Sequence, residues 1–106
     1  MSGRTLLVSR HPGAQQWLEA EAAARSWKDI AILPHLELEA LSARTPARVA
    51  GVLPLAIAAR LTRLGVEVWH LDLVPGPGDR GQELSCAQMK RLGARLCRYE
   101  VHQLCR

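Results

Sequence analysis

Ser9, Arg10 and His11 are the residues best suited to chemistry, because three different polar groups stand side by side after an apolar run. Arginine holds phosphate oxygens with a planar fork of donors. Serine can position a phosphate, and histidine can act as an acid, a base or a hydrogen-bond donor. We predict that these three are the catalytic residues of a site for a phosphate-bearing ligand. The alternative is that Ser9 only caps the turn and that His11 is a solvated loop residue.

Further candidates lie near the loop over residues 75–81, which is rich in glycine and proline. Asp79, Arg80 and Glu83 are expected to come near the first turn, where Arg80 could supply a second phosphate contact. A flexible loop with a solvated Arg–Glu pair is an equally good interpretation. Asp72 could bind a ribose hydroxyl, although the capping of a turn is the stronger interpretation of its position.

No set of metal ligands is apparent in the sequence. His35 and His102 have no partner at metal-ligand spacing, and His70 is expected to be a core histidine inside an apolar strand. The three cysteines fit inert packing thiols, and the phosphate-loop and dinucleotide-binding glycine patterns are missing. We therefore expect no metal and no cofactor. RNA can still be cleaved, because its 2′-hydroxyl is an internal nucleophile whose positioning can supply about 7–11 kcal/mol of the barrier.

The elements that must position the first turn are a strand and a helix. Residues 5–8 form a continuous apolar run, which is typical of a strand buried on both faces. Pro12 and Gly13 interrupt it, and the period becomes helical from Ala14. The predicted buried stripe of this helix contains Trp17, Ala20, Ala24 and Trp27. A helix N-terminus favours an anion, so the turn lies where a phosphate is best held.

The rest of the chain continues the alternation of strands and helices. A second strand is expected over residues 30–33, with Pro34 indicating an edge or a strand end. Residues 37–45 fit either a strand extension or one helical turn. A third strand over 48–53 leads at Pro54 into a helix, and a fourth strand covers 66–71. The stripe of that helix contains Ile57, Leu61 and Leu64, and Gly65 ends it.

The last helix is predicted to begin with a capping box formed by Ser85 and Gln88. Its buried stripe contains Met89, Leu92, Leu96 and Tyr99, and its basic flank contains Lys90, Arg91, Arg95 and Arg98. The fold class is therefore α/β, with a mostly parallel sheet of about four strands covered by helices on both faces. Ligands bind such sheets at the carboxyl ends of the strands, near the switch in strand order. The loops at 9–13, 53–54 and 75–81 qualify.

Length and composition set further limits. The 106 residues form one domain over positions 1–106, small enough that dimerisation is a plausible route to further burial. No apolar run is long enough for a membrane span or a signal peptide, so a cytoplasmic location is expected. The net charge of +4, with twelve arginines against two lysines, suits an anionic ligand. With four aromatic residues the chain lacks a stacking platform for single-stranded RNA, and neither DNA nor a membrane is an expected partner.

Three motifs resemble a small CRISPR-associated ancillary family that is found with type III systems. The first is Ser9-Arg10-His11-Pro12-Gly13-Ala14, with Trp17 close behind it. The second is Gly51-Val52-Leu53-Pro54, a strand end that runs into a helix. The third is Arg80-Gly81-Gln82-Glu83-Leu84-Ser85, before the last helix. The three occur in the family's order and span most of the chain. The chain departs from the family's pattern at Val52 and Ala56, where small polar residues are frequent.

The resemblance implies a ring nuclease with a Rossmann-like, CARF-like domain of three layers. Such enzymes degrade cyclic tetra-adenylate, the messenger of type III CRISPR systems, and they need no metal. They bind the ring on the two-fold axis of a homodimer. The resemblance implies that Ser9, Arg10 and His11 line the ring. The residues expected to bind and enclose it are Pro12, Gly13, Gly51, Leu53, Pro54, Asp79, Arg80, Gly81 and Glu83.

Three other functions remain open at this stage. A sensor or sponge would bind cyclic oligoadenylate without cleaving it, through the same residues. A histidine phosphatase also opens with a strand that ends in Arg-His, but Pro12 replaces its usual glycine and no second histidine motif follows. A subunit of a larger ribonucleoprotein has only the basic flank of the last helix in its favour.

Overall fold

The computed structural model describes residues 3–37, 39, 41, 44–74 and 83–105 of the chain. Their strands are β1 (Thr5–Val8), β2 (Ile30–Leu33), β3 (Arg48–Gly51), β4 (Glu67–Asp72) and β5 (Arg95–Tyr99). The helices are α1 (Pro12–Ala24), α3 (Leu55–Arg63) and α4 (Cys86–Arg91). None of these helices is both long and apolar enough to cross a membrane.

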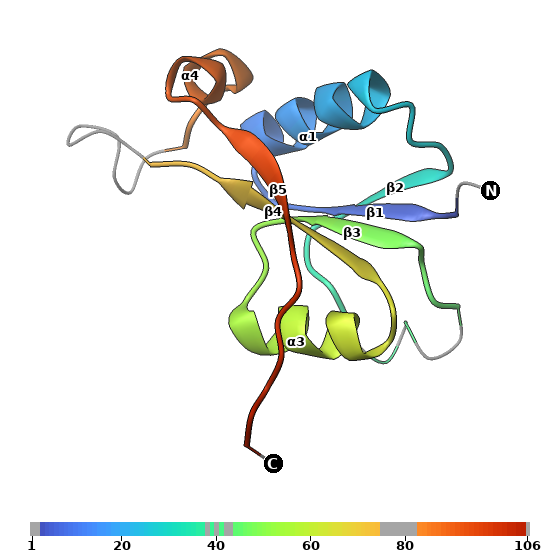
Figure 1. Ribbon diagram of the computed structural model, residues 1–106. Helices are drawn as coiled ribbons and strands as arrows, with labels where there is room; N and C mark the ends of the chain where they lie inside the picture. Colours follow the sequence, from blue (N-terminus) through green and yellow to red (C-terminus); the bar gives the residue numbers. More distant parts are fainter. Residues whose placement is uncertain (1–2, 38, 40, 42–43, 75–82, 106) are drawn as a thin grey trace.

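The strands form one sheet in the order β2-β1-β3-β4-β5 (Figure 1). β1 pairs in parallel with β2 and with β3, and β3 pairs in parallel with β4. β5 is antiparallel to β4 and closes that side of the sheet. One row of paired residues runs across the carboxyl ends of the parallel strands, through Val8, Gly51 and His70. This is a small Rossmann-like α/β domain whose strand order reverses between β1 and β3.

Helices cover both faces of the sheet, so the domain has three layers (Figure 1). α1 and α4 lie on one face, where Leu7, Leu18 and Met89 are buried together. α3 lies on the other face, where Leu61 packs with Val49 and Val68. Because side chains alternate along a strand, the apolar run of β1 supplies both cores, with Leu7 on one face and Leu6 and Val8 on the other.

The predictions for the first four strands and the fold class are confirmed, with shifted ends. The third strand stops at Gly51 rather than at position 53, because the chain leaves the sheet there to reach α3. Pro54 is the N-cap of α3 rather than its first helical residue. The sheet has five strands among the described residues rather than about four. β2 lies at an edge of the sheet, as Pro34 indicated.

The predicted stripes of the first two helices are partly wrong. In α1, Trp17 is buried together with Leu18 and Ala22, whereas Ala20 and Ala24 are exposed. Trp27 lies beyond the end of α1 and packs edge-on against Trp69. In α3, Leu61 is buried, but Leu64 is 46% exposed. Ala58 and Ala59 take its place, because small side chains let the helix approach the sheet closely.

The prediction of one long final helix is wrong. The capping box of Ser85 and Gln88 is present and opens α4, but α4 ends at Arg91. Gly93, with φ at 78°, reverses the chain into β5. Met89 and Leu96 are buried as expected, although they belong to a helix and a strand. Tyr99, expected on a buried stripe, is 44% exposed on β5.

Candidate functional site

A cavity of about 410 Å³ opens at the carboxyl edge of the sheet, where the strand order reverses. Ligands of doubly wound α/β folds bind at this place, because the loops after neighbouring strands turn away to opposite faces and leave a crevice. The lining comes from the turn before α1, the segment after β2, the β3–α3 connection and the first turn of α3. These residues are Val8, Ser9, Arg10, His11, Ala14, Pro34, His35, Leu36, Val52, Leu53, Pro54 and Ile57.

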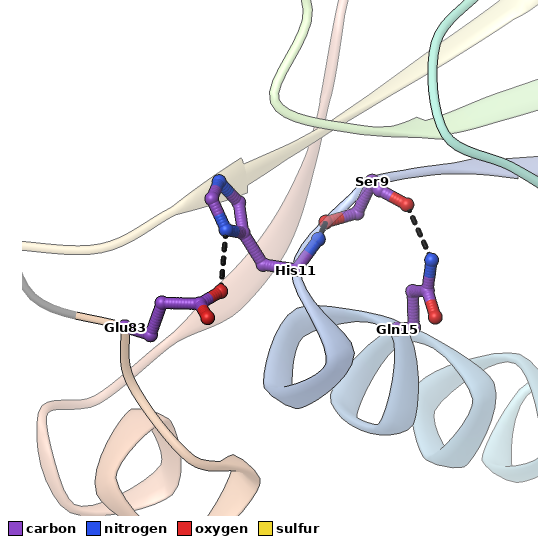
Figure 2. Close-up of polar contacts among 4 residues, drawn as sticks. All are labelled: Ser9, His11, Gln15 and Glu83. Atoms are coloured by element: carbon purple, nitrogen blue, oxygen red, sulfur yellow. Dashed lines mark hydrogen bonds and ion pairs between the residues drawn. The ribbon is translucent and has the colours of Figure 1, made fainter.

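Ser9 builds the turn that leads into α1. Its hydroxyl accepts a hydrogen bond from the backbone N–H of His11 at 3.1 Å. Its carbonyl oxygen accepts one from the Gln15 side-chain amide at 2.6 Å (Figure 2). Its own N–H donates to the carbonyl oxygen of Leu33 at 2.9 Å. These contacts are those of a turn-capping serine. The hydroxyl proton takes no part in them, so a ligand oxygen can still accept it.

Arg10 supplies the positive charge at the mouth of the cavity. Its side chain is exposed, and within the described part of the chain it makes no hydrogen bond or ion pair. It stands two residues before α1, whose first-turn N–H groups point toward the same side. α1 carries no acidic residue in its first turn that would compete for these donors. An anion bound here would therefore meet a guanidinium and a helix N-terminus together.

His11 is hydrogen-bonded to a residue that lies 72 positions away in the sequence. Its Nδ1 lies 2.7 Å from Oε1 of Glu83, and Figure 2 shows the two side chains pointing toward each other. A carboxylate in this position accepts the Nδ1 proton and leaves Nε2 with its lone pair. The expectation that residues near 83 approach the first turn is thereby confirmed for Glu83. Asp79, Arg80 and Gly81 lie outside the described residues.

Gly13 explains why Glu83 reaches His11. A Cβ atom at this position would lie 1.9 Å from the carbonyl oxygen of Leu84, so the first turn of α1 and the segment before α4 are in backbone contact. The sequence pattern placed Gly13 in the interruption between strand and helix, but Gly13 lies within α1, just after Pro12 at its start. The glycine is therefore needed for close approach rather than for an unusual backbone conformation.

Gly51 lets the other wall of the cavity form. Its φ is 152°, and a Cβ here would lie 2.3 Å from the carbonyl oxygen of Val8 on the neighbouring strand. After Gly51 the chain turns outward, so that Val52 is 65% exposed while Leu53 is buried at 6%. Leu53 and Pro54 then line the cavity, as the position of their loop predicted.

His35 also lines this cavity, and the sequence analysis did not select it. It follows β2, and its Nε2 lies 3.0 Å from Oε1 of Glu37. A signal was present in the sequence, because the carboxyl end of the second strand must meet the same edge as those of the first and third. The spacing of metal ligands concerns distance along the sequence, so it gives no information on which strand ends meet at one edge of the sheet.

His70, Asp72 and Tyr99 form a second polar cluster on β4 and β5. His70 Nδ1 lies 2.8 Å from Asp72 Oδ1, and the Tyr99 hydroxyl donates to Asp72 Oδ2 at 2.5 Å. Asp72 is the last residue of β4 rather than a turn residue, and His70 is half-buried rather than a core residue. The three side chains line a second cavity of about 290 Å³, which also contacts Leu53.

The cluster perturbs its own titration. The hydrogen bonds from Tyr99 and then from His70 lower the pKa of Asp72 from 3.8 to about 2. The hydrogen bond to the same carboxylate raises the pKa of the Tyr99 hydroxyl, because loss of the Tyr99 proton would place two negative charges side by side. It also raises the pKa of the Cys97 thiol, beside it on β5. Asp72 is thus a stable anion held within the fold.

Among the described residues, no group of three histidine, cysteine or acidic side chains is placed to hold a metal ion. The histidines at the cavity are each paired with a single carboxylate, His11 with Glu83 and His35 with Glu37.

The comparison with protein-family models gives one match, over residues 6–102, to the family described as "Putative CRISPR-associated protein (Cas_VVA1548)". The chain belongs to this family. The matched region of this CRISPR-associated protein contains the whole lining of the cavity and also Glu83. No curated protein and no solved structure matches the chain.

Proposed function

We propose that this CRISPR-associated protein is a metal-independent ring nuclease that cleaves cyclic tetra-adenylate as a homodimer. The observation that carries the proposal is the cavity at the strand-order switch, where Arg10, His11 and the start of α1 stand together. Membership of a CRISPR-associated family supports it, and so does the resemblance of the three sequence motifs to ring nucleases.

The electrostatics of the cavity favour a phosphodiester. Arg10 has no partner among the described residues, so its guanidinium is available to two phosphate oxygens. The backbone N–H donors at the start of α1 add a fixed partial positive charge. Leu53, Pro54 and Ile57 supply an apolar wall against which a base or ribose can pack. One cavity of about 410 Å³ lies near the lower limit for ligand sites and encloses only part of a four-nucleotide ring. A second copy of the chain would hold the remainder.

The reaction needs little beyond positioning. The ribose 2′-hydroxyl attacks the adjacent phosphorus in line, the bond to the 5′-oxygen breaks, and a 2′,3′-cyclic phosphate and a 5′-hydroxyl result. Two such cleavages convert the ring into two linear di-adenylates. In this mechanism Arg10 stabilises the crowded phosphate, Ser9 orients it and His11 accepts the 2′-proton at Nε2. Holding the nucleophile in place can supply about 7–11 kcal/mol of the barrier.

The test is cleavage of radiolabelled cyclic tetra-adenylate in the presence of EDTA. The wild type is expected to yield linear di-adenylate that ends in a 2′,3′-cyclic phosphate. His11→Ala should slow cleavage by about 100-fold or more, because general acid–base catalysis contributes on that scale. Arg10→Ala should weaken binding by about 10-fold or more, because it removes a charge-assisted contact. Arg60→Ala, which removes an exposed arginine on α3, is the matched control and should leave the rate unchanged.

Other outcomes would favour other functions. An intact ring that co-elutes with the protein would indicate a sensor or sponge. A phosphohistidine trapped on His11 would indicate a phosphatase. The proposal would be refuted if the protein neither bound nor cleaved cyclic tetra-adenylate and cyclic hexa-adenylate.

A further inference from the structure

Two histidines of the cavity lining are each paired with a glutamate, and the two pairs come from separate parts of the chain. His11 pairs with Glu83, and His35 pairs with Glu37 through its Nε2 at 3.0 Å. Both histidines line the cavity and both are well exposed, with side chains 57% and 71% accessible. In each pair the carboxylate accepts one ring proton, so the second nitrogen is left for a ligand. His11 keeps Nε2 for this purpose, and His35 keeps Nδ1.

The two histidines reach the cavity from different elements of the fold. β2, which leads to His35, lies beside β1 on the side away from β3. His11 turns instead toward Glu83, in the segment before α4, and α4 packs against α1 (Figure 1, Figure 2). A phosphate held by Arg10 and the start of α1 would therefore have one imidazole toward β2 and another toward α4.

We propose that His35 is the general acid of the ring-nuclease reaction and that His11 is its general base. The proposal rests on the proposed function. In-line displacement places the attacking 2′-oxygen and the leaving 5′-oxygen on opposite sides of the phosphorus. We assign the attacking 2′-oxygen to the side of His11, the N-cap residue of α1. The leaving oxygen then lies on the side of His35.

The two imidazoles between them accept and donate the protons of the step. Nε2 of His11 takes the proton from the 2′-hydroxyl as the bond from the 2′-oxygen to phosphorus forms. The bond from phosphorus to the 5′-oxygen breaks, and the 5′-oxygen takes the Nδ1 proton of His35, which enters the step as an imidazolium with a proton on each ring nitrogen. Glu37 holds the His35 ring in place by accepting from Nε2. After product release, a proton passes through solvent from His11 to His35, so neither metal nor cofactor enters the balance.

The deciding experiment compares two forms of cyclic tetra-adenylate: the normal ring, and a sulfur ring in which sulfur replaces each bridging 5′-oxygen. A thiol loses its proton at a pH of about 8.5, so a thiolate leaves without a general acid. On the normal ring, His35→Gln should cleave about 100-fold slower than the wild type. On the sulfur ring, His35→Gln should equal the wild type, whereas His11→Ala should stay slow. This split separates proton donation from substrate binding or positioning.

His102 provides the matched control. It also pairs with a glutamate, Glu100, at 3.4 Å, and both side chains are about as exposed as those of His35 and Glu37. It lies outside the lining of the cavity, so His102→Gln should leave both rates within about twofold of the wild type. A His35→Gln variant within threefold of the wild type on the normal ring overturns the inference. So does an equal loss on both rings. If the wild type cleaves neither ring, the proposed function itself fails.

Discussion

Replacing Gly13 with alanine sets two opposite effects against each other. Within a helix, alanine is more stable than glycine by about 0.5–1 kcal/mol, because the unfolded chain has less backbone freedom to lose. The new Cβ, however, would lie 1.9 Å from the carbonyl oxygen of Leu84, where ordinary contact begins at 3.4 Å. The obstacle is backbone, which cannot change rotamer, so the segment before α4 must move by about 1.5 Å.

The steric effect should prevail. Overpacking of this kind costs about 1–3 kcal/mol. Once the helix gain of about 0.5–1 kcal/mol is subtracted, Gly13→Ala should lower the free energy of unfolding by about 1 kcal/mol, and by about 2.5 kcal/mol at most. For a domain of about 100 residues, each kcal/mol lowers Tm by about 4–8 °C. The assay is urea unfolding followed by tryptophan fluorescence, with Trp17, which is buried in α1 itself, as the reporter. The affected segment also carries Glu83, so the His11 pair should be lost in the same variant.

The control for this prediction is an exposed alanine in the same helix. Ala20→Gly should destabilise the chain by about 0.5–1 kcal/mol through helix propensity alone. If Gly13→Ala stabilises the protein by a similar amount, then propensity governs both positions. The backbone contact between Gly13 and Leu84 would then be refuted, together with its role in placing Glu83.

Three further predictions concern stability. The pKa of Asp72 is about 2 in the folded chain and 3.8 ordinarily, so as the pH falls the unfolded state takes up this proton first. The free energy of unfolding should therefore fall between about pH 4 and pH 2. Urea titrations should show a shallower fall in Asp72→Asn, and an unchanged slope would contradict the contacts of Asp72 with Tyr99 and His70. Ser85→Ala should cost about 1 kcal/mol in the same assay, since it removes the N-cap of α4, and no loss would mean that α4 is held by packing alone. Leu18→Ala should cost about 2–5 kcal/mol because Leu18 is fully buried, and a loss below 1 kcal/mol would place α1 away from the sheet.

The parts of the fold that the sequence predicts well are those decided by local pattern. The apolar run over Thr5–Val8 and the change of period after Pro12 each need only a few neighbouring residues. The capping box at Ser85 is equally local. Each of these signals concerns hydrogen bonds or packing within one element, and each is found where it was expected.

β5 shows where local pattern fails. Met89, Leu92 and Leu96 are spaced as on a helix, so they predict one long helix, yet Leu96 is buried on a strand. What decides the matter is pairing with β4, where Leu96 lies opposite Leu71. Such pairing depends on residues far apart in the sequence, and strand preference follows that context. The one local sign that the helix ends early was Gly93, a residue that commonly follows the end of a helix.

The candidate site divides in the same way. Ser9, Arg10 and His11 could be selected because strand ends in a parallel sheet share one edge. His35 could have been selected by the same reasoning applied to β2, but its spacing was tested only against metal sites. The contact of His11 with Glu83 could not be predicted as a pair, since it depends on the backbone approach at Gly13.

The parallel pairing of β1 with β3 also sets the order in which the molecule can be built. Thr5 and Arg48 are neighbours in the sheet, so everything between them must be made before this pairing begins. Closing such long loops before any contact forms makes folding slow compared with that of a helical bundle. During synthesis, the residues at 9–11 emerge early but have neither their β3 wall nor Glu83. A chain that ends before Ile57 therefore lacks part of the cavity lining, and the pair of His11 with Glu83 forms only after residue 83 has left the ribosome.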